Sequence, residues 1–200
     1  MSSASDNSAL LPDAEAYEER AFGFWLYLMS DAIIFALLFA TYQIMANDTG
    51  GGPAGRDLFS LPHTFGETLM LLTSSLTFGL ASLALDAGKR RWVLAWLAVT
   101  FLLGLGFVAM EVHEFHDMIA QGAGPGRSGF LSAFFTLVST HGLHVSAGLV
   151  FIVVMVVQVV VKGLSQPVSS RLERLGLFWH FLDIVWIGIF SVVYLPGILQ

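Results

Sequence analysis

The stretch STHGLHVSAG, residues 139–148, lies inside an apolar run that extends from residue 130 to residue 161. The run contains no Lys, Arg, Asp or Glu, and it exceeds the roughly 20 apolar residues that a helix needs to cross a membrane. His141 and His144 lie three residues apart in its middle, so they share one face of the predicted helix. An imidazole in hydrocarbon needs a hydrogen-bond partner, and the small residues around the pair let a neighbouring helix approach closely. We therefore expect this helix to pack against others, in a reaction centre or in a scaffold.

The composition of the whole chain is that of a membrane protein. Its 200 residues are 56% hydrophobic and only 12% charged, and the net charge is −6. The sequence has no Lys/Arg-rich stripe that would neutralise phosphates, so nucleic acid is not an expected partner. The chain contains no cysteine, which excludes disulfides, iron–sulfur clusters and thiolate zinc sites.

Five apolar segments predict an all-α integral membrane protein, a bundle of five transmembrane helices after a soluble tail. The tail covers residues 1–20 and the transmembrane domain covers residues 21–200. Spans are expected at about 21–46, 63–85, 92–116, 130–161 and 175–199. Residues 162–174 are expected to form a basic loop before the last span.

The basic residues are distributed unequally over the connecting segments. One side of the membrane receives only Arg56 and Arg127, whereas seven basic residues fall on the other: Arg20, Lys89, Arg90, Arg91, Lys162, Arg171 and Arg174. Because Lys- and Arg-rich loops remain in the cytoplasm, this pattern predicts a cytoplasmic N-terminus and a periplasmic C-terminus.

Several ionisable residues fall inside the predicted spans, where each acid costs about 2.5–3.5 kcal/mol on insertion scales. They are Asp31, Glu67, Glu111, Glu114, His141, His144, His180 and Asp183. Three interpretations remain open. Repeated i,i+3 pairs are compatible with a metal or haem site in a helical bundle; Asp31 or Glu67 could handle protons; or the residues form hydrogen bonds that fix the helices relative to one another.

Several motifs together resemble subunit III of haem–copper terminal oxidases. The first three are LMSD at 28–31, Glu67 to Ser75 (ETLMLLTSS) and EVHEF at 111–115. The other two are FF at 134–135 with HGLHV at 141–145, and FWHFLDIVW at 178–186. These matches extend over all five spans in the same order. The loops at 51–57 and 124–131, and the five-span layout, are most similar to the bacterial cytochrome bo-type ubiquinol oxidase branch of that family.

The resemblance implies an accessory subunit with no haem, copper, metal-binding or catalytic residue of its own. Its partners would be subunit I, which holds haem and copper, and the other subunits of the oxidase in the bacterial inner membrane. That complex oxidises ubiquinol, reduces oxygen to water and moves protons outward. Asp31 corresponds to a membrane-buried glutamate of longer members that reacts with carbodiimide. Alternatives are subunit III of a cytochrome c oxidase and a small proton-coupled transporter.

The resemblance also implies a bound phospholipid. Longer family members hold phospholipid in a cleft between their first two helices and the rest, and those two helices have no counterpart here. We therefore expect another subunit to complete any such cleft. The candidates for contacts with a lipid headgroup are basic residues near the predicted cytoplasmic ends of the spans: Arg90, Arg91, Lys162, Arg171 and Arg174.

Overall fold

The computed structural model describes residues 11–53 and 55–199, and every regular element in these ranges is helical. The predicted tail lies partly outside the described residues, since the described chain begins at residue 11, already in a helix. The elements are α1 (Leu11–Met45), α2 (Gly55–Leu58), α3 (Leu61–Asp86), α4 (Arg90–Ala120), α5 (Gly129–Lys162), α6 (Gln166–Ile189), the π-helix η2 (Phe190–Tyr194) and α7 (Leu195–Leu199).

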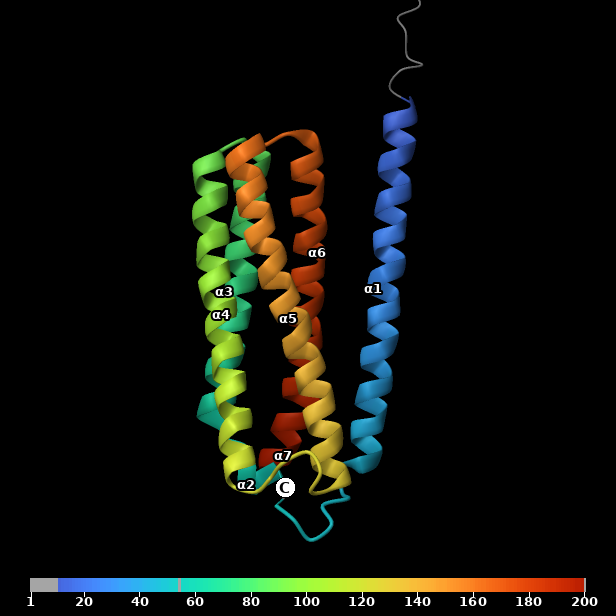
Figure 1. The fold of residues 1–200 in the computed structure, drawn as a ribbon, viewed down its shortest axis with the longest axis vertical. Helices are drawn as coiled ribbons and strands as arrows, with labels where there is room; N and C mark the ends of the chain where they lie inside the picture. The colour runs from blue at the N-terminus through green and yellow to red at the C-terminus, as the bar shows by residue number, and fades with distance from the viewer. Residues whose placement is uncertain (1–10, 54, 200) are drawn as a thin grey trace, which may run out of the picture.

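Five helical segments are long and apolar enough to cross a membrane, which confirms the predicted all-α class with five spans. These segments are Ala21–Met45, Leu61–Asp86, Arg90–Ala120, Gly129–Lys162 and Gln166–Ile198. Figure 1 shows α3, α4, α5 and α6 side by side in one bundle, whereas α1 stands at its edge. Helix α1 packs mainly on α5 and also contacts α6. The four-helix bundle therefore forms the centre of the fold, and α1 is peripheral.

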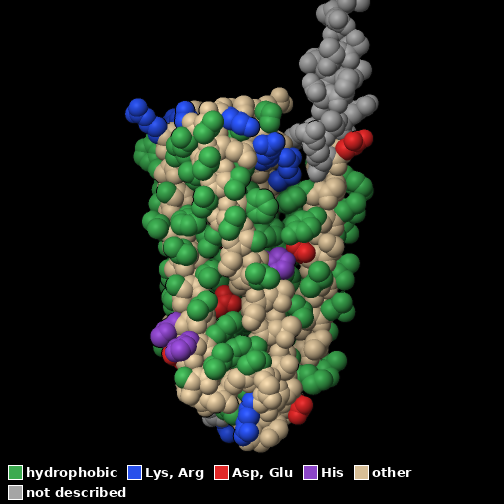
Figure 2. All heavy atoms as spheres, viewed as in Figure 1, with side chains coloured by type: hydrophobic (Ala, Val, Ile, Leu, Met, Phe, Trp, Pro, Cys, Tyr) green, Lys and Arg blue, Asp and Glu red, His purple; other side chains and the backbone are tan. Residues whose placement is uncertain are grey.

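The connections at the two ends of the bundle differ. At one end, where α1 begins, a short turn joins α3 to α4 and another joins α5 to α6 (Figure 1). Each turn contains a glycine with a positive φ, Gly88 at 66° and Gly163 at 68°, which other residues rarely adopt. We call this the basic end, because Figure 2 shows Lys and Arg side chains gathered there. The opposite end carries the longer loops with α2 and α7, and we call it the α2–α7 end.

Helix α6 begins earlier than the sequence predicted. The basic loop expected at residues 162–174 is reduced to a short connection, because α6 starts at Gln166 with Pro167 in its first turn, where the missing N–H of proline is tolerated. Hydropathy missed these first turns because they are polar, although their backbone is helical. Consequently Arg171 and Arg174 project from a helix, and Arg171 donates a 2.8 Å hydrogen bond to Gln158 Oε1 of α5.

Two tryptophans of α6 fix this helix within the bundle. Trp179 is 1% exposed, and its indole lies against two glycines, Gly104 of α4 and Gly148 of α5. Its N–H donates a 3.0 Å hydrogen bond to Ser74 Oγ of α3. Two turns further on, Trp186 is fully buried and donates a 3.1 Å bond to Thr68 Oγ1 of the same helix. Helix α6 is thereby joined to α3 at two depths.

Candidate functional site

Asp31 and His144 form a polar pair between α1 and α5. His144 Nε2 lies 3.6 Å from Asp31 Oδ2, and only 5% of Asp31 is exposed. His144 Nδ1 is 2.7 Å from the carbonyl oxygen of Thr140, and a carbonyl can only accept, so Nδ1 carries a hydrogen. Nε2 then faces the Asp31 carboxyl group at a distance slightly beyond that of a direct hydrogen bond. The pair thus places two polar side chains opposite each other at the contact of α1 with α5.

His141 lies in a different environment from His144. It is fully buried, and neither of its ring nitrogens has a hydrogen-bond partner among the described residues. Its ring stacks on Trp186 with a centroid distance of 5.3 Å and meets the edge of Phe107 at 5.9 Å. Residues three apart point in directions about 60° apart around a helix axis. This divergence lets His144 face α1 while His141 faces the bundle interior, so the two histidines have different neighbours although the sequence places them on one helical face.

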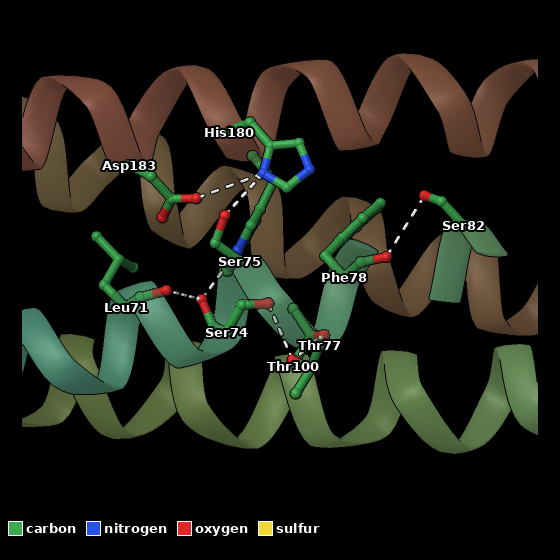
Figure 3. A network of polar contacts seen from close by, with 10 residues as sticks. Leu71, Ser74, Ser75, Thr77, Phe78, Ser82, Thr100, His180 and Asp183 are labelled. Carbon is green, nitrogen blue, oxygen red and sulfur yellow. Dashed lines mark hydrogen bonds and ion pairs between the residues drawn. The ribbon is translucent and has the colours of Figure 1, made fainter. Parts of the chain in front are cut away.

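His180 and Asp183 belong to a polar network between α6 and α3, drawn in Figure 3. His180 Nδ1 is 2.7 Å from Ser75 Oγ and 3.6 Å from Asp183 Oδ2. On the neighbouring turn, the hydroxyls of Thr77 and Thr100 are 2.8 Å apart and join α3 to α4. Interhelical hydrogen bonds of this type contribute about 0.6–2 kcal/mol each in membranes. This network therefore holds helices together.

The three glutamates, Glu67 of α3 and Glu111 and Glu114 of α4, form a cluster nearer the α2–α7 end. They are 0%, 3% and 8% exposed, respectively. The hydroxyl of Tyr194 donates a 2.8 Å hydrogen bond to Glu114 Oε2, and His63 Nε2 lies 3.3 Å from Glu67 Oε1. Sequence reasoning missed both of these partners. The i,i+4 spacing of His63 and Glu67 on one helix was a usable signal, whereas nothing local indicated Tyr194.

A cavity of about 790 Å³ lies between α1, α5 and α6 toward the basic end. Its lining is mostly apolar, with Phe24 and Tyr27 from α1, His144 from α5, and Arg171 and Arg174 from α6. These lining residues lie on three helices, of which α1 is far from the other two in the sequence. That another subunit completes a lipid cleft stays a prediction. Figure 2 shows a hollow between α1 and the bundle at this end, with basic side chains beside it.

The remaining basic residues predicted to contact lipid lie at the same end but do not line the cavity. The guanidinium of Arg90 donates a 2.6 Å hydrogen bond to the carbonyl oxygen of Val160, and Arg91 and Lys162 are exposed. No group of three or more His, Asp or Glu side chains within residues 11–53 and 55–199 is arranged to hold a metal ion.

Five long apolar helices in the described part of the chain, joined by buried polar contacts, place this chain in the class of multi-pass helical membrane proteins. The chain belongs to the cytochrome c oxidase subunit III family, whose sequence profile matches residues 15–198. Subunit III is the accessory subunit of haem–copper oxidases and lacks redox centres. The family predicted from the sequence is thus confirmed, and the chain is one subunit of a terminal oxidase complex.

Curated relatives agree with this family over most of the chain. The chain is 57% identical over 177 residues to cytochrome bo(3) ubiquinol oxidase subunit 3 of Pseudomonas putida, covering 88% of this chain and 86% of the relative. It is 46% identical over 185 residues to the protein of the same name from Buchnera aphidicola subsp. Baizongia pistaciae, covering 92% and 95%. Cytochrome c oxidase subunit 3 of Bacillus sp. (strain PS3) is 40% identical over 180 residues, covering 90% and 87%.

Proposed function

We propose that this chain is the accessory subunit III of a proton-pumping ubiquinol oxidase in the bacterial inner membrane. Its role is to stabilise the catalytic subunit, which carries haem and copper, and to hold phospholipid beside it. The main support is the 57% identity to a ubiquinol oxidase subunit. Ubiquinol as the electron donor is supported by the relatives at 46–57% identity, which are named as subunits of cytochrome bo(3) ubiquinol oxidase.

The proposed orientation places the basic end in the cytoplasm. Lys89, Arg90 and Arg91 lie at the α3–α4 turn and Lys162 ends α5, whereas the opposite end carries Arg56 and Arg127. Such an excess of basic residues near short loops is retained in the cytoplasm.

This orientation can be tested by labelling, because the chain has no cysteine. Ala87→Cys lies in the turn at the basic end, and Gly126→Cys lies in an exposed loop at the α2–α7 end. In intact spheroplasts, a membrane-impermeant thiol reagent should label the Gly126→Cys chain but not the Ala87→Cys chain. Ala87→Cys should be labelled only after the membrane is opened. The reverse pattern would contradict the proposed orientation.

The cavity between α1, α5 and α6 suits a phospholipid. Its apolar walls match acyl chains, and Arg171 and Arg174 lie where a headgroup phosphate would be. Each guanidinium has five N–H donors, and the structure engages Arg171 with Gln158 and Arg174 with Ser170, so further donors are left for a phosphate. We therefore propose that these two arginines bind the phosphate of a lipid whose chains lie along α5.

Replacing both arginines should release this lipid. A cation near the membrane surface contributes about 1 kcal/mol to binding, so the double variant Arg171→Gln and Arg174→Gln should weaken lipid retention roughly 30-fold. Mass spectrometry of the complex purified in detergent would measure the amount of bound phospholipid per complex. Arg91→Gln is the matched control, because Arg91 is exposed at the same end and does not line the cavity. Equal lipid content in the double variant and the control would refute this assignment.

A further inference from the structure

The three glutamates of α3 and α4, which we call the carboxyl cluster, lie well inside the membrane-spanning part of the chain. Glu67 is six residues from the start of α3, and Glu111 is nine residues from the end of α4. At 1.5 Å per residue, these positions are about 9 Å and 14 Å from the helix ends. Trp186 connects the two sides of the cluster: its N–H bonds Thr68, the residue after Glu67, and its ring centroid lies 6.0 Å from that of Tyr194, which donates to Glu114. Two helices thus bring three acids together in a region that excludes water.

The helical spans around the cluster carry no Lys or Arg between their ends. Residues 61–86, 92–120, 129–161 and 175–199 contain no Lys or Arg. Both oxygens of Glu111 and Oε2 of Glu67 lack a hydrogen-bond partner among the described residues, although both side chains are more than nine-tenths buried. An isolated ionised carboxylate is very costly in such surroundings, and in practice it takes up a proton. Burial without a paired cation therefore favours the neutral, protonated form of these acids.

The cluster is tightly packed inside the bundle, and one of its neighbours reaches the surface. The Glu111 carboxyl lies against Gly142 of α5, where an added Cβ would be 2.6 Å from its Oε1. Tyr194, which donates to Glu114, lies in η2, and π-helical turns often occur at functional sites. The buried Nε2 of His63 faces Glu67, whereas 29% of the His63 side chain is exposed. His63 therefore connects the cluster to the surface at the α2–α7 end.

We propose that the carboxyl cluster is a proton-binding site that exchanges protons with the compartment at the α2–α7 end through His63. In this exchange, the ring of His63 accepts a proton from water on its exposed side and releases one from Nε2 to Glu67 Oε1. The titratable groups that face the cluster are His63 of α3 and Tyr194 of η2. Helix α5 contributes His141 next to Gly142, and α6 contributes only the uncharged Trp186 at this depth. The unpartnered oxygens of Glu111 and Glu67 are the atoms at which protons bind.

Infrared spectroscopy of the complete oxidase complex in lipid vesicles tests the binding site. At neutral pH, we expect the carbonyl-stretch band of a protonated carboxylic acid, and we expect it to shift in D₂O. Glu111→Gln and Glu67→Gln should each reduce this band, because glutamine has nearly the same shape as glutamate but has no carboxylic acid group to give the band. Asp117→Asn is the control, since Asp117 lies on the same helix with 53% of its side chain exposed. Identical spectra for the native complex and both glutamine variants would overturn the proposal.

The rate of the D₂O shift tests the route of exchange. A positioned proton-transfer group contributes a factor of about 10²–10⁴, so His63→Phe should keep the band but slow its shift roughly a hundredfold. His113→Phe is the matched control, because His113 is 70% exposed on α4 and pairs with Asp117. An unchanged rate in His63→Phe would show that protons do not enter through this histidine.

Discussion

Trp186→Ala is expected to lower the free energy of unfolding of this subunit by about 3–5 kcal/mol, the range for truncating a large buried aromatic residue. Trp186 is fully buried and meets Phe107 edge-on with a centroid distance of 4.6 Å. It also stacks on His141, and its N–H bonds Thr68 of α3. Truncation would therefore open a cavity where α3, α4, α5 and α6 meet, and it would remove one of the few contacts of the His141 ring.

Unfolding by a denaturing detergent, followed by tryptophan fluorescence and by retention of the subunit in the complex, would measure this effect. Trp92→Ala is the control, because Trp92 is 55% exposed and an exposed position should change stability by only about 0.5 kcal/mol. Trp186→Phe should lie between the two, since it keeps most of the volume and loses the hydrogen bond to Thr68. Equal stability of the Trp186→Ala and Trp92→Ala variants would contradict the central role of Trp186.

Gly148→Leu should disrupt the packing of α5 against α6. A Cβ at Gly148 would lie 2.9 Å from Cζ3 of Trp179, and a Cβ at Gly104 would lie 2.9 Å from Cη2 of the same ring. The indole is thus held between two glycines of different helices and cannot move aside. Overpacking of a core costs about 1–3 kcal/mol, and here it would also separate α5 from α6. We expect the subunit to be lost from the purified complex.

The control for this prediction is Gly79→Leu. Gly79 lies within α3, and an added Cβ there would meet nothing within 4 Å. Both substitutions remove a helical glycine, so they differ chiefly in the space available to the new side chain. The amount of subunit per haem in the purified complex would compare them. Normal retention of the Gly148→Leu chain would mean that α6 can shift without loss of assembly.

Much of the fold was predictable because a segment that crosses the hydrocarbon of a membrane must be long, apolar and helical. A segment such as residues 130–161 has no charged residue and exceeds the thickness of the membrane, so hydropathy alone indicates a helix. The start of α6 at Gln166 was not predictable in this way. Its first turns are polar and lie at the basic end, and hydropathy does not distinguish a polar helical turn from a loop.

The candidate site was less predictable, because it depends on which helix faces which. The sequence placed His141 and His144 on one helical face. The structure instead brings His144 to Asp31 across the α1–α5 contact and surrounds His141 with aromatic rings. Periodicity gives the direction of a side chain around its own helix, but it does not give the neighbouring helix in that direction. Tyr194 was missed for the same reason.

The peripheral position of α1 has a consequence for biosynthesis. Helix α1 is made first, yet the helices it packs on, α5 and α6, are made last. At about 5–20 residues per second, Asp31 leaves the ribosome roughly 5–25 s before His144. During that interval α1 must reside in the bilayer as an isolated helix, with its buried acid not yet paired. The order of translation thus makes docking of α1 a late step, after the hairpin of α3 and α4 has already formed.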